Sequence, residues 1–338
     1  MLHRRKFIQQ SSMAIPALMI PGSLISPTKI NKMADSKNFD VIIVGGSYAG
    51  LSAAMALGRS LRNVLIIDSG LPCNRQTPHS HNFITQDGKT PAEISALAKQ
   101  QVEKYTTVKF HNGLAETAVK TENGFEITTK LDEKFHAKKL IFATGIKDIM
   151  PAIKGFEQCW GISVIHCPYC HGYEVKNEVT GILANGEVAM HVAPLVHNLT
   201  KKLTIYTNGA SAFTDEQMAQ LKKQGIPVVE AEIEELRHHN GSIEQIVFRN
   251  DDAQPIKALY AKPAFVQHSD IPEKLGCELT EQGFIKVDAF QKTNVPGVFA
   301  CGDNTTMMRS VANAVAVGNL AGAMANKEMA DELWQAGY

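Results

Sequence analysis

The stretch FDVIIVGGSYAGLSAAMALGRS, residues 39–60, decides the fold of this chain of 338 residues. Its apolar, β-branched residues 41–44 predict a buried strand, a glycine turn follows, and small and apolar residues predict a helix over about 49–59. A strand, a glycine turn and a helix in this order open a βαβ unit, in which a dinucleotide pyrophosphate can bind at the N-terminus of the helix. We therefore expect an α/β fold.

The turn differs from the dinucleotide-binding fingerprint G-x-G-x-x-G at one position. Gly45, Ser47 and Gly50 occupy the three glycine positions, so a serine replaces the middle glycine. The next predicted strand, NVLIID, ends at Asp68, 18 residues (68 − 50) after Gly50 and near the place where a carboxylate bonds a ribose hydroxyl. Any βαβ unit can end a strand in an acid, but the spacing and the context together favour nucleotide binding.

The length and the charge of the chain limit its organisation and its partners. A chain of 338 residues exceeds the size at which one hydrophobic core stops growing, so we expect two core-forming units. Lys+Arg and Asp+Glu are both 34, and no long run of like charge occurs. We therefore expect no nucleic-acid partner, and instead a small molecule or another protein.

The N-terminus, MLHRRKFIQQSSMAIPALMIPGSLI, joins a basic start with Arg4 and Arg5 to a short apolar run. Pro16 and Pro21 interrupt this run, which is too short for a membrane span. The segment is similar to a twin-arginine export signal, which predicts an exported, periplasmic protein. The alternative is a cytoplasmic protein that starts at Met33, just before the nucleotide-binding strand.

A second nucleotide-like unit follows the first. The predicted strand in AKKLIFATGI (137–146) runs into Thr144 and Gly145, which we expect to cross back to the first nucleotide site. Apolar periodicity lapses over 150–161, which places a domain boundary near residue 151. Strand, turn and helix signals recur over 179–208, but this turn lacks the first glycine. The residues after it, TNG, offer neither arginines for a 2′-phosphate nor an acid for a ribose hydroxyl.

The C-terminal part carries a further strand and a helix. In GFIKVDAFQKTNVPGVFACGDN, residues 283–304, a predicted strand runs into Gly302 and Asp303. The segment from about 310 to 329 is small and apolar throughout, which predicts a buried helix. The N-terminal end of this helix could point at a phosphate or a flavin ring.

Two of the six cysteines stand at a spacing that carries chemistry. VIHCPYCHGYE (164–174) separates Cys167 from Cys170 by two residues. This predicts a redox disulfide, because a nearby helix N-terminus can lower the pKa of one thiol. A zinc site could use His166 and His171 but needs a further ligand pair, which the sequence does not show, and C-x-x-C-H also fits a c-type haem attachment. We expect the other four to be buried small hydrophobes: Cys73, Cys159, Cys277 and Cys301.

These motifs, in this order, resemble the low-molecular-weight thioredoxin reductase family of FAD-linked pyridine nucleotide-disulfide oxidoreductases. The resemblance covers about residues 39–329 and rests on VGGSYAG, ATG, the C-x-x-C motif and TNVPGVFACGDN. It implies a homodimer built from two Rossmann-like, three-layer nucleotide-binding domains, the second inserted into the first. The implied limits are 38–151 and 259–338 for the FAD-binding domain, 152–258 for the NAD(P)-binding-like domain with the disulfide, and 1–37 for the export-signal-like segment.

The resemblance also implies roles for individual residues. Cys170 would be the sulfur on the flavin side, Cys167 the sulfur that exchanges with the substrate, and His171 the proton-transferring group in place of the family's aspartate. No metal is expected, and the family usually has glutamine where Ser310 stands. The residues expected to hold FAD are Gly45, Gly46, Ser47, Ala49, Gly50, Asp68, Asn82, Thr144, Gly145, Gly302, Asp303, Arg309 and Ser310.

The direction of electron flow stays open between two activities. A reductase would carry electrons from NADP(H) or NAD(H) to a small disulfide or a thioredoxin-like protein. The motifs CPYCHGYE and VGGSYAGLSAAMALGR and the loop 79–82 look closest to the dithiol oxidase branch of the gliotoxin and holomycin type. Those relatives pass electrons from a small dithiol through FAD to dioxygen. A non-enzymatic alternative is a flavin redox sensor or electron carrier.

We expect Ser47→Gly, which restores the fingerprint, to retain FAD as well as the wild-type protein or better, because glycine lets the backbone approach the pyrophosphate closely. The ratio of flavin to protein absorbance after purification measures this retention. A clear loss of FAD would show that the fingerprint is misaligned.

Overall fold

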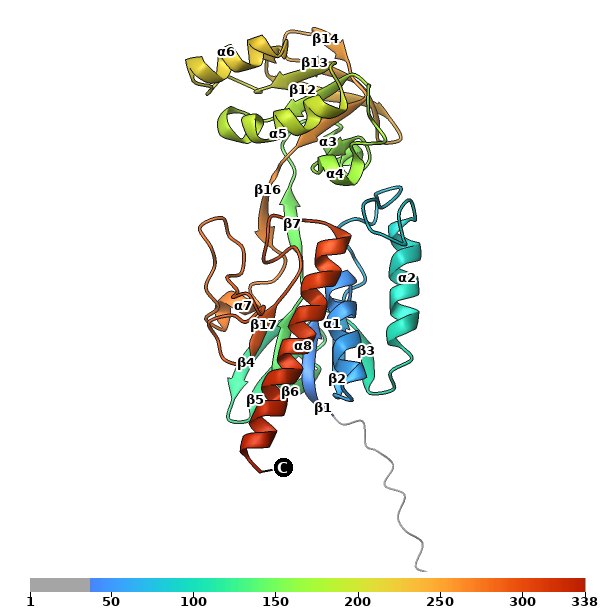
Figure 1. Ribbon diagram of the computed structural model, residues 1–338, viewed down its shortest axis with the longest axis vertical. Helices are drawn as coiled ribbons and strands as arrows, with labels where there is room; N and C mark the ends of the chain where they lie inside the picture. The colour runs from blue at the N-terminus through green and yellow to red at the C-terminus, as the bar shows by residue number, and fades with distance from the viewer. Residues whose placement is uncertain (1–36, 338) are drawn as a thin grey trace, which may run out of the picture. The chain divides into compact units, whose positions relative to one another are not determined.

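The computed structural model describes residues 37–337, and the predicted export signal and the alternative start at Met33 lie outside them. The first sheet has the strand order β3-β2-β1-β6-β5-β4, with β17 also paired to β6 (Figure 1). Its strands are β1 (Asn38–Val44), β2 (Val64–Asp68), β3 (Val108–Asn112), β4 (Ala115–Thr121), β5 (Gly124–Thr129), β6 (Lys134–Phe142) and β17 (Val298–Ala300).

The centre of this sheet is parallel, so several strands end at the same edge. β1 lies between β2 and β6, with Val44 opposite both Ile67 and Phe142. β17 runs parallel beside the last residues of β6, whereas the antiparallel β5 pairs with its first half. The carboxyl ends of β1, β2, β6 and β17 therefore meet at one edge, which is where ligands bind in open parallel sheets.

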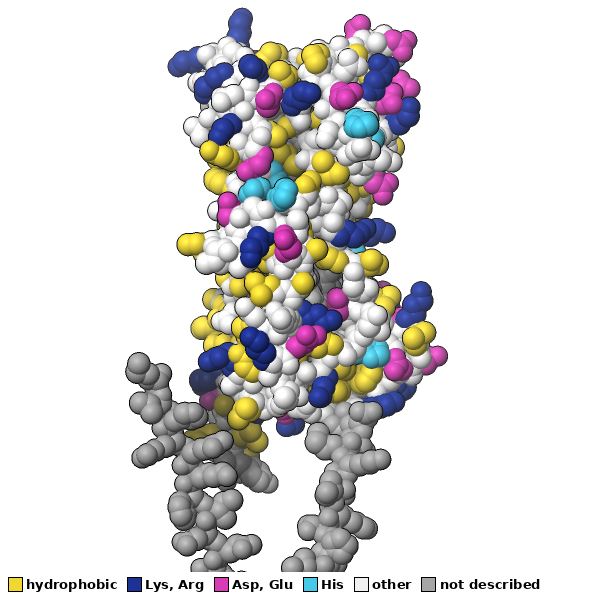
Figure 2. All heavy atoms as spheres, turned by 90° about the vertical axis from the view of Figure 1, so that its right-hand side faces the viewer, with side chains coloured by type: hydrophobic (Ala, Val, Ile, Leu, Met, Phe, Trp, Pro, Cys, Tyr) yellow, Lys and Arg dark blue, Asp and Glu magenta, His cyan; other side chains and the backbone are white. Residues whose placement is uncertain are grey.

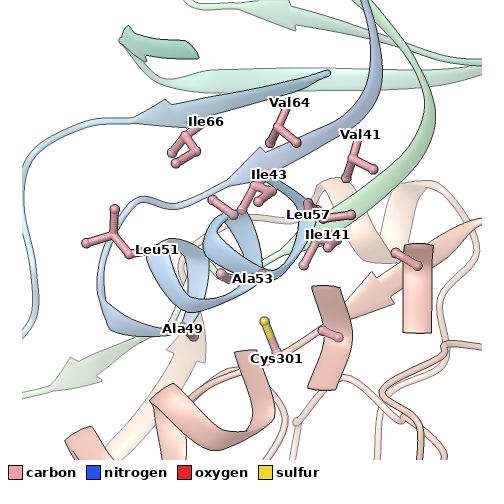
Figure 3. Close-up of a cluster of buried hydrophobic side chains, with 14 of the residues drawn as sticks. Val41, Ile43, Ala49, Leu51, Ala53, Leu57, Val64, Ile66, Ile141 and Cys301 are labelled. Carbon is pink, nitrogen blue, oxygen red and sulfur yellow. The ribbon is translucent and has the colours of Figure 1, made fainter. Parts of the chain in front are cut away.

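Three long helices accompany this sheet: α1 (Tyr48–Arg59), α2 (Pro91–Val102) and α8 (Val311–Gln335). α1 contacts both α2 and α8, and Figure 1 shows α1 and α8 side by side. Figure 3 shows how Ile43 of β1 and Val64 and Ile66 of β2 face α1, where Leu57 is fully buried. The apolar residues of the opening stretch therefore form the core that fixes the start of α1 at the sheet edge.

Small residues bring α1 and α8 into backbone contact. A Cβ at Gly318 would overlap the backbone oxygen of Ala49, and one at Gly322 would overlap that of Ala53. These two glycines lie one turn apart on α8, so the helix approaches α1 more closely than larger side chains would allow. The predicted C-terminal helix is confirmed, although it is buried on this face alone and ends in exposed residues such as Trp334.

The second parallel sheet has the order β11-β10-β9-β15-β8. It contains β8 (Val164–Ile165), β9 (Thr180–Leu183), β10 (Leu203–Tyr206), β11 (Val228–Val229) and β15 (Ala258–Ala261), with α5 (Gly186–Leu199) following β9 and α6 (Asp215–Lys223) following β10. An antiparallel sheet of β12 (Ile233–His239), β13 (Ser242–Phe248) and β14 (Ala253–Pro255) follows in the chain before β15. The predicted second βαβ unit is thus present.

A two-stranded ribbon carries the chain out of the first sheet and back again. β7 (Ile146–Ile149) follows β6 and pairs antiparallel with β16 (Ala264–Gln267), which follows β15. Since β15 pairs with β9 and β8, it belongs to the second sheet although it spans the predicted return at residue 259. The exact domain limits stay a prediction.

Three short helices complete the described elements: α3 (Phe156–Cys159), α4 (Pro168–His171) and α7 (Ile271–Lys274). None of the helices in the described part of the chain is long and apolar enough to cross a membrane. From Lys37 onward the chain forms one compact unit by its internal contacts.

We expect Gly318→Val to lower the free energy of unfolding by about 1–3 kcal/mol, because the new side chain forces α8 away from Ala49. Urea unfolding followed by circular dichroism measures the change. Asn319→Val is the matched control, since Asn319 is the next residue on the same helix and is exposed. Equal stability of the two variants would contradict the close packing of α1 and α8.

Candidate functional site

A cavity of about 820 Å³ lies at the carboxyl edge of the first sheet. It brings together predicted site residues from distant parts of the sequence. The predicted residues that line it are Gly45, Gly46, Ser47, Ala49, Asp68, Thr144, Gly145, Cys170, His171, Gly302, Asp303, Arg309 and Ser310.

Three predicted site residues do not line the cavity. Gly50 lies behind the wall, where a Cβ would overlap the backbone oxygen of Gly45, so its glycine serves the tight turn. Asn82 is exposed in the left-handed conformation (φ +58°), and its neighbour His81 lines the cavity instead. The third is Cys167, whose disulfide partner does line it.

The N-terminus of α1 meets the cavity without a side-chain cap. Ser47 occupies the N-cap position but makes no side-chain hydrogen bond to the helix. By contrast, side chains cap the other described helices of nine or more residues, through Thr90, Asn185, Thr214 and Ser310. Free N–H groups and the helix dipole favour an anion at this end of α1. The residues present therefore fit the pyrophosphate of a dinucleotide.

Asp68 stands where the fingerprint predicts an acid. Its Oδ1 accepts a hydrogen bond from the N–H of Gly46 at 2.9 Å, and its Oδ2 accepts one from Gly70 at 3.1 Å. A Cβ at Gly46 would lie 2.8 Å from the Cβ of Asp68, so only glycine permits this approach. The two bonds hold the carboxylate at the cavity wall, beside the glycine turn, where it can bond a ribose hydroxyl.

Arg309 forms a buried ion pair at the far end of the cavity. Its guanidinium donates two hydrogen bonds to Asp148 of β7, at 2.7 and 2.9 Å, and its Nε lies 3.5 Å from Oδ2 of Asp303. Burial raises the pKa of the Asp303 carboxyl, and the charge of Arg309 opposes this shift. A charged group at this depth needs such partners, because an unpaired buried charge is strongly destabilising.

Cys167 and Cys170 form the predicted disulfide at the start of α4. The backbone N–H of Cys170 donates to Sγ of Cys167 at 3.1 Å, a contact that would stabilise a thiolate there after reduction. Of the two cysteines, Cys170 lines the cavity, whereas the side chain between them, Tyr169, is 68% exposed. The disulfide thus joins the cavity to the surface of the protein.

Histidines and carboxylates lie close to this disulfide. Figure 2 shows histidine side chains gathered beside acidic ones midway along the face that it draws. The Nδ1 of His81 lies 3.6 Å from Asp87, and its Nε2 lies 3.6 Å from Glu174, four residues after Cys170. The loop over residues 71–90 and the segment after the disulfide are therefore linked by charge.

His171 has a pKa below its ordinary value. Burial is the main cause, a charged His81 lowers the pKa further, and the carboxylate of Glu174 raises it. Its imidazole is therefore neutral near neutral pH, and it lines the same cavity as Cys170. A neutral imidazole in this position can accept the proton of a thiol.

His166 lines the cavity on the other side of the cysteine pair. Its ring centroid lies 5.9 Å from that of Trp160, and its Nε2 is buried with no hydrogen-bond partner among the described residues. Burial lowers the pKa of His166 to about 4, and the positive charge of Arg309 acts in the same direction. This histidine is therefore neutral at physiological pH.

The second nucleotide-like turn is occupied by its own side chain. The Oδ1 of Asn185 accepts hydrogen bonds from the N–H groups of Gly186 (2.9 Å) and Ala212 (2.8 Å), and its Nδ2 donates to Ala210 at 2.9 Å. Glu187 adds a carboxylate to the first turn of α5. The N-terminus of α5 is thus capped and carries a negative charge, the opposite of the open N-terminus of α1.

The sequence analysis missed several residues at the cavity. His81 and Trp160 line it, and Asp148 pairs with its wall, but none of the three belongs to a recognised motif. The prediction that Cys73 is buried is wrong, because the loop that follows β2 places it, exposed, in the cavity lining. Cys159, Cys277 and Cys301 are buried as predicted.

Within residues 37–337, no group of three or more His, Cys, Asp or Glu side chains could hold a metal ion.

Comparison with known proteins places this site in context. Residues 39–318 match a protein family described as pyridine nucleotide-disulphide oxidoreductase. The chain is 34% identical to thioredoxin reductase tcpT of Claviceps purpurea over 313 residues, which cover 89% of this chain and 97% of that protein. It is 31% identical to thioredoxin reductase sirT of Leptosphaeria maculans over 305 residues, covering 85% and 93%. The crystal structure of an oxidoreductase from Agrobacterium tumefaciens superposes with a TM-score of 0.82 at 38% identity, covering 87% and 99%. These similarities confirm the predicted fold class.

Proposed function

Because the chain belongs to the pyridine nucleotide-disulphide oxidoreductase family, we propose that it is an FAD-dependent dithiol oxidase. It takes two electrons from a small dithiol through the Cys167–Cys170 disulfide. One observation carries this direction of flow: the N-terminus of α1 is open, whereas Asn185 caps that of α5. A nicotinamide dinucleotide would have to displace the Asn185 cap and place its phosphates beside Glu187. The cavity at α1 presents no such barrier to FAD.

The second candidate is an NAD(P)H-dependent disulfide reductase. The family description and the names of the fungal relatives favour it, and the strand, turn and helix of the second unit are retained. A reductase of this kind would need NAD(P)H to bind at the capped α5. The two candidates therefore differ in which molecule delivers electrons.

The residues at the first site would hold FAD in an extended form. The N–H groups at the start of α1 would bind the pyrophosphate, Asp68 the adenosine ribose, and Asp303 the region of the ribityl chain. When bound, FAD accepts the two electrons of the reduced cysteine pair and passes them to dioxygen, which leaves as hydrogen peroxide.

The cysteine pair and His171 carry out the sulfur chemistry. One thiolate of the substrate attacks Cys167, the S–S bond breaks, and Cys170 leaves as a thiolate. The second substrate thiol then attacks the mixed disulfide, which releases the oxidised substrate and frees Cys167. Two protons leave the substrate in this exchange, and the neutral His171 accepts one of them. The placement of Cys170 in the cavity lining supports its role as the sulfur on the flavin side.

Two further parts of the proposal rest on the sequence. The twin-arginine-like segment predicts export to the periplasm, where a dithiol oxidase needs no nicotinamide supply, and the family resemblance predicts a homodimer. Fractionation of cells that produce the full chain, and light scattering of the purified protein, test these two predictions separately.

Anaerobic addition of NADPH, NADH or dithiothreitol to the purified yellow protein tests the direction of flow. We expect dithiothreitol alone to bleach the flavin, and air to restore the colour with release of hydrogen peroxide. Rapid bleaching by NADPH would overturn the oxidase and establish the reductase. A single bleaching without sustained oxygen uptake would instead indicate a redox sensor.

We expect Cys170→Ser to retain FAD but to lose flavin reduction by dithiothreitol, because the disulfide that accepts the electrons is absent. Stopped-flow absorbance under argon measures the reduction. Cys277→Ser is the control, since Cys277 is buried away from the cavity lining and should leave the rate unchanged. Wild-type kinetics in Cys170→Ser would exclude the cysteine pair from the electron path.

We expect Glu174→Gln to shift the acid limb of the pH–rate profile to lower pH. The carboxylate of Glu174 raises the pKa of His171, so its loss lowers that pKa and keeps the imidazole neutral in more acidic solution. His81→Asn should shift the limb the other way, because a charged His81 lowers the same pKa. Identical limbs in all three proteins would show that another group controls the acid side.

A further inference from the structure

Asp148 is buried without a place in the chemistry described so far. Its side chain is 6% exposed, it lies on the connecting strand β7, and both of its oxygens bond to Arg309. An ion pair taken out of water gains little net stability over apolar residues of similar size, although breaking it costs about 3–5 kcal/mol. A pair of this kind is better suited to fixing one arrangement of the surrounding segments than to stabilising the fold.

Arg309 connects three segments that are far apart in the sequence. Its side chain bonds to Asp148 on β7 and approaches Asp303 in the turn after β17. Its backbone hydrogen-bonds to His166. Arg309 also directly precedes Ser310, the N-cap of α8. The residue therefore lies at a junction of the connecting ribbon, the flavin-site turn and the redox segment.

His166 transmits this junction to the disulfide. It is the residue before Cys167, and its ring packs against Trp160 with the centroids 5.9 Å apart. The strand before it, β8, is two residues long and pairs with β15 alone. So short an edge strand gives the redox segment little backbone anchoring of its own. The contacts of His166 with Arg309 and Trp160 supply further anchoring next to the sulfur atoms.

We propose that Asp148 and His166 are positioning residues, which act through Arg309 to hold the Cys167–Cys170 disulfide in register with the flavin site. This inference rests on the proposed function, since it concerns the transfer of electrons from the cysteine pair to FAD. Transfer between reacting groups requires near contact, and a displacement of about 1 Å can cost roughly 100-fold in rate. Neither residue needs to touch the substrate or gain a proton for this role.

The inference separates two steps that a purely structural role would affect together. Opening of the disulfide by dithiothreitol needs access from the surface, where Tyr169 is exposed, whereas reduction of the flavin needs the register between Cys170 and the cavity. Loss of register should therefore slow the second step and spare the first.

The test compares Asp148→Asn and His166→Phe with the wild-type holoprotein under argon. Asparagine keeps an acceptor for Arg309 without the charge, and phenylalanine keeps a ring against Trp160 without the contact to Arg309. Asp40→Asn is the control, because Asp40 pairs with Lys138 at 2.9 Å outside the cavity lining. After mixing with dithiothreitol, thiol alkylation and mass spectrometry follow the opening of the disulfide, and visible absorbance follows the flavin, normalised to the FAD content.

We expect both variants to open the disulfide at the wild-type rate but to reduce the flavin about 10- to 100-fold more slowly, and Asp40→Asn to match the wild type in both steps. The double variant should be no slower than the slower single variant, since both changes act through Arg309.

Flavin reduction at the wild-type rate in both single variants, or additive losses in the double variant, would overturn the inference and leave the proposed function intact. Equal slowing of both steps would also overturn it, because it would indicate a general loss of structure. A wild-type protein that opens its disulfide and keeps its flavin oxidised would overturn the proposed function and this inference with it.

Discussion

The uncapped N-terminus of α1 is the constraint around which the first sheet is arranged. Its N–H groups have no side-chain partner from Ser47, so the fold provides an anion site instead of a cap. The glycine turn, the carboxylate of Asp68 and the close approach of α8 all depend on the position of this helix. The buried side chains of β1 and β2 hold α1 at that position, and the cavity follows from it.

The second nucleotide-like unit keeps the architecture of the first but not its binding surface. Both units place a helix after a buried strand, and both helices begin at the carboxyl edge of a parallel sheet. In the second unit, however, Asn185 ties the start of α5 to the loop at residues 210–212, and Glu187 opposes an anion. The retained strands have another use, because β8 carries the chain to His166 and the disulfide. Conservation of a fold and conservation of its ligand are thus separable in one chain.

Local sequence was sufficient for much of the fold and of the flavin site. The strand, turn and helix at residues 39–60, the acid at Asp68 and the C-x-x-C pair are contiguous patterns whose geometry is set within one supersecondary unit. Asp148, His81 and Trp160 could not be predicted in this way, because their roles arise from contacts between segments far apart in the chain. Cys73 was misjudged for the same reason: a loop residue is buried or exposed according to what packs against it. The missing first glycine before Asn185 gave a correct warning about the second site, but not the cap that fills it.

The different ends of α1 and α5 also bear on how the protein matures. A helix whose N–H groups are satisfied by its own chain is complete as soon as it folds, so α5 places no demand on the supply of a second cofactor. The end of α1 is completed by a ligand, and a ligand that binds the native state alone stabilises it by RT ln(1 + [L]/Kd). The fraction of folded chains should therefore follow the concentration of flavin in the cell and be indifferent to that of nicotinamide. Newly made protein would then accumulate as holoprotein only where its flavin is already available.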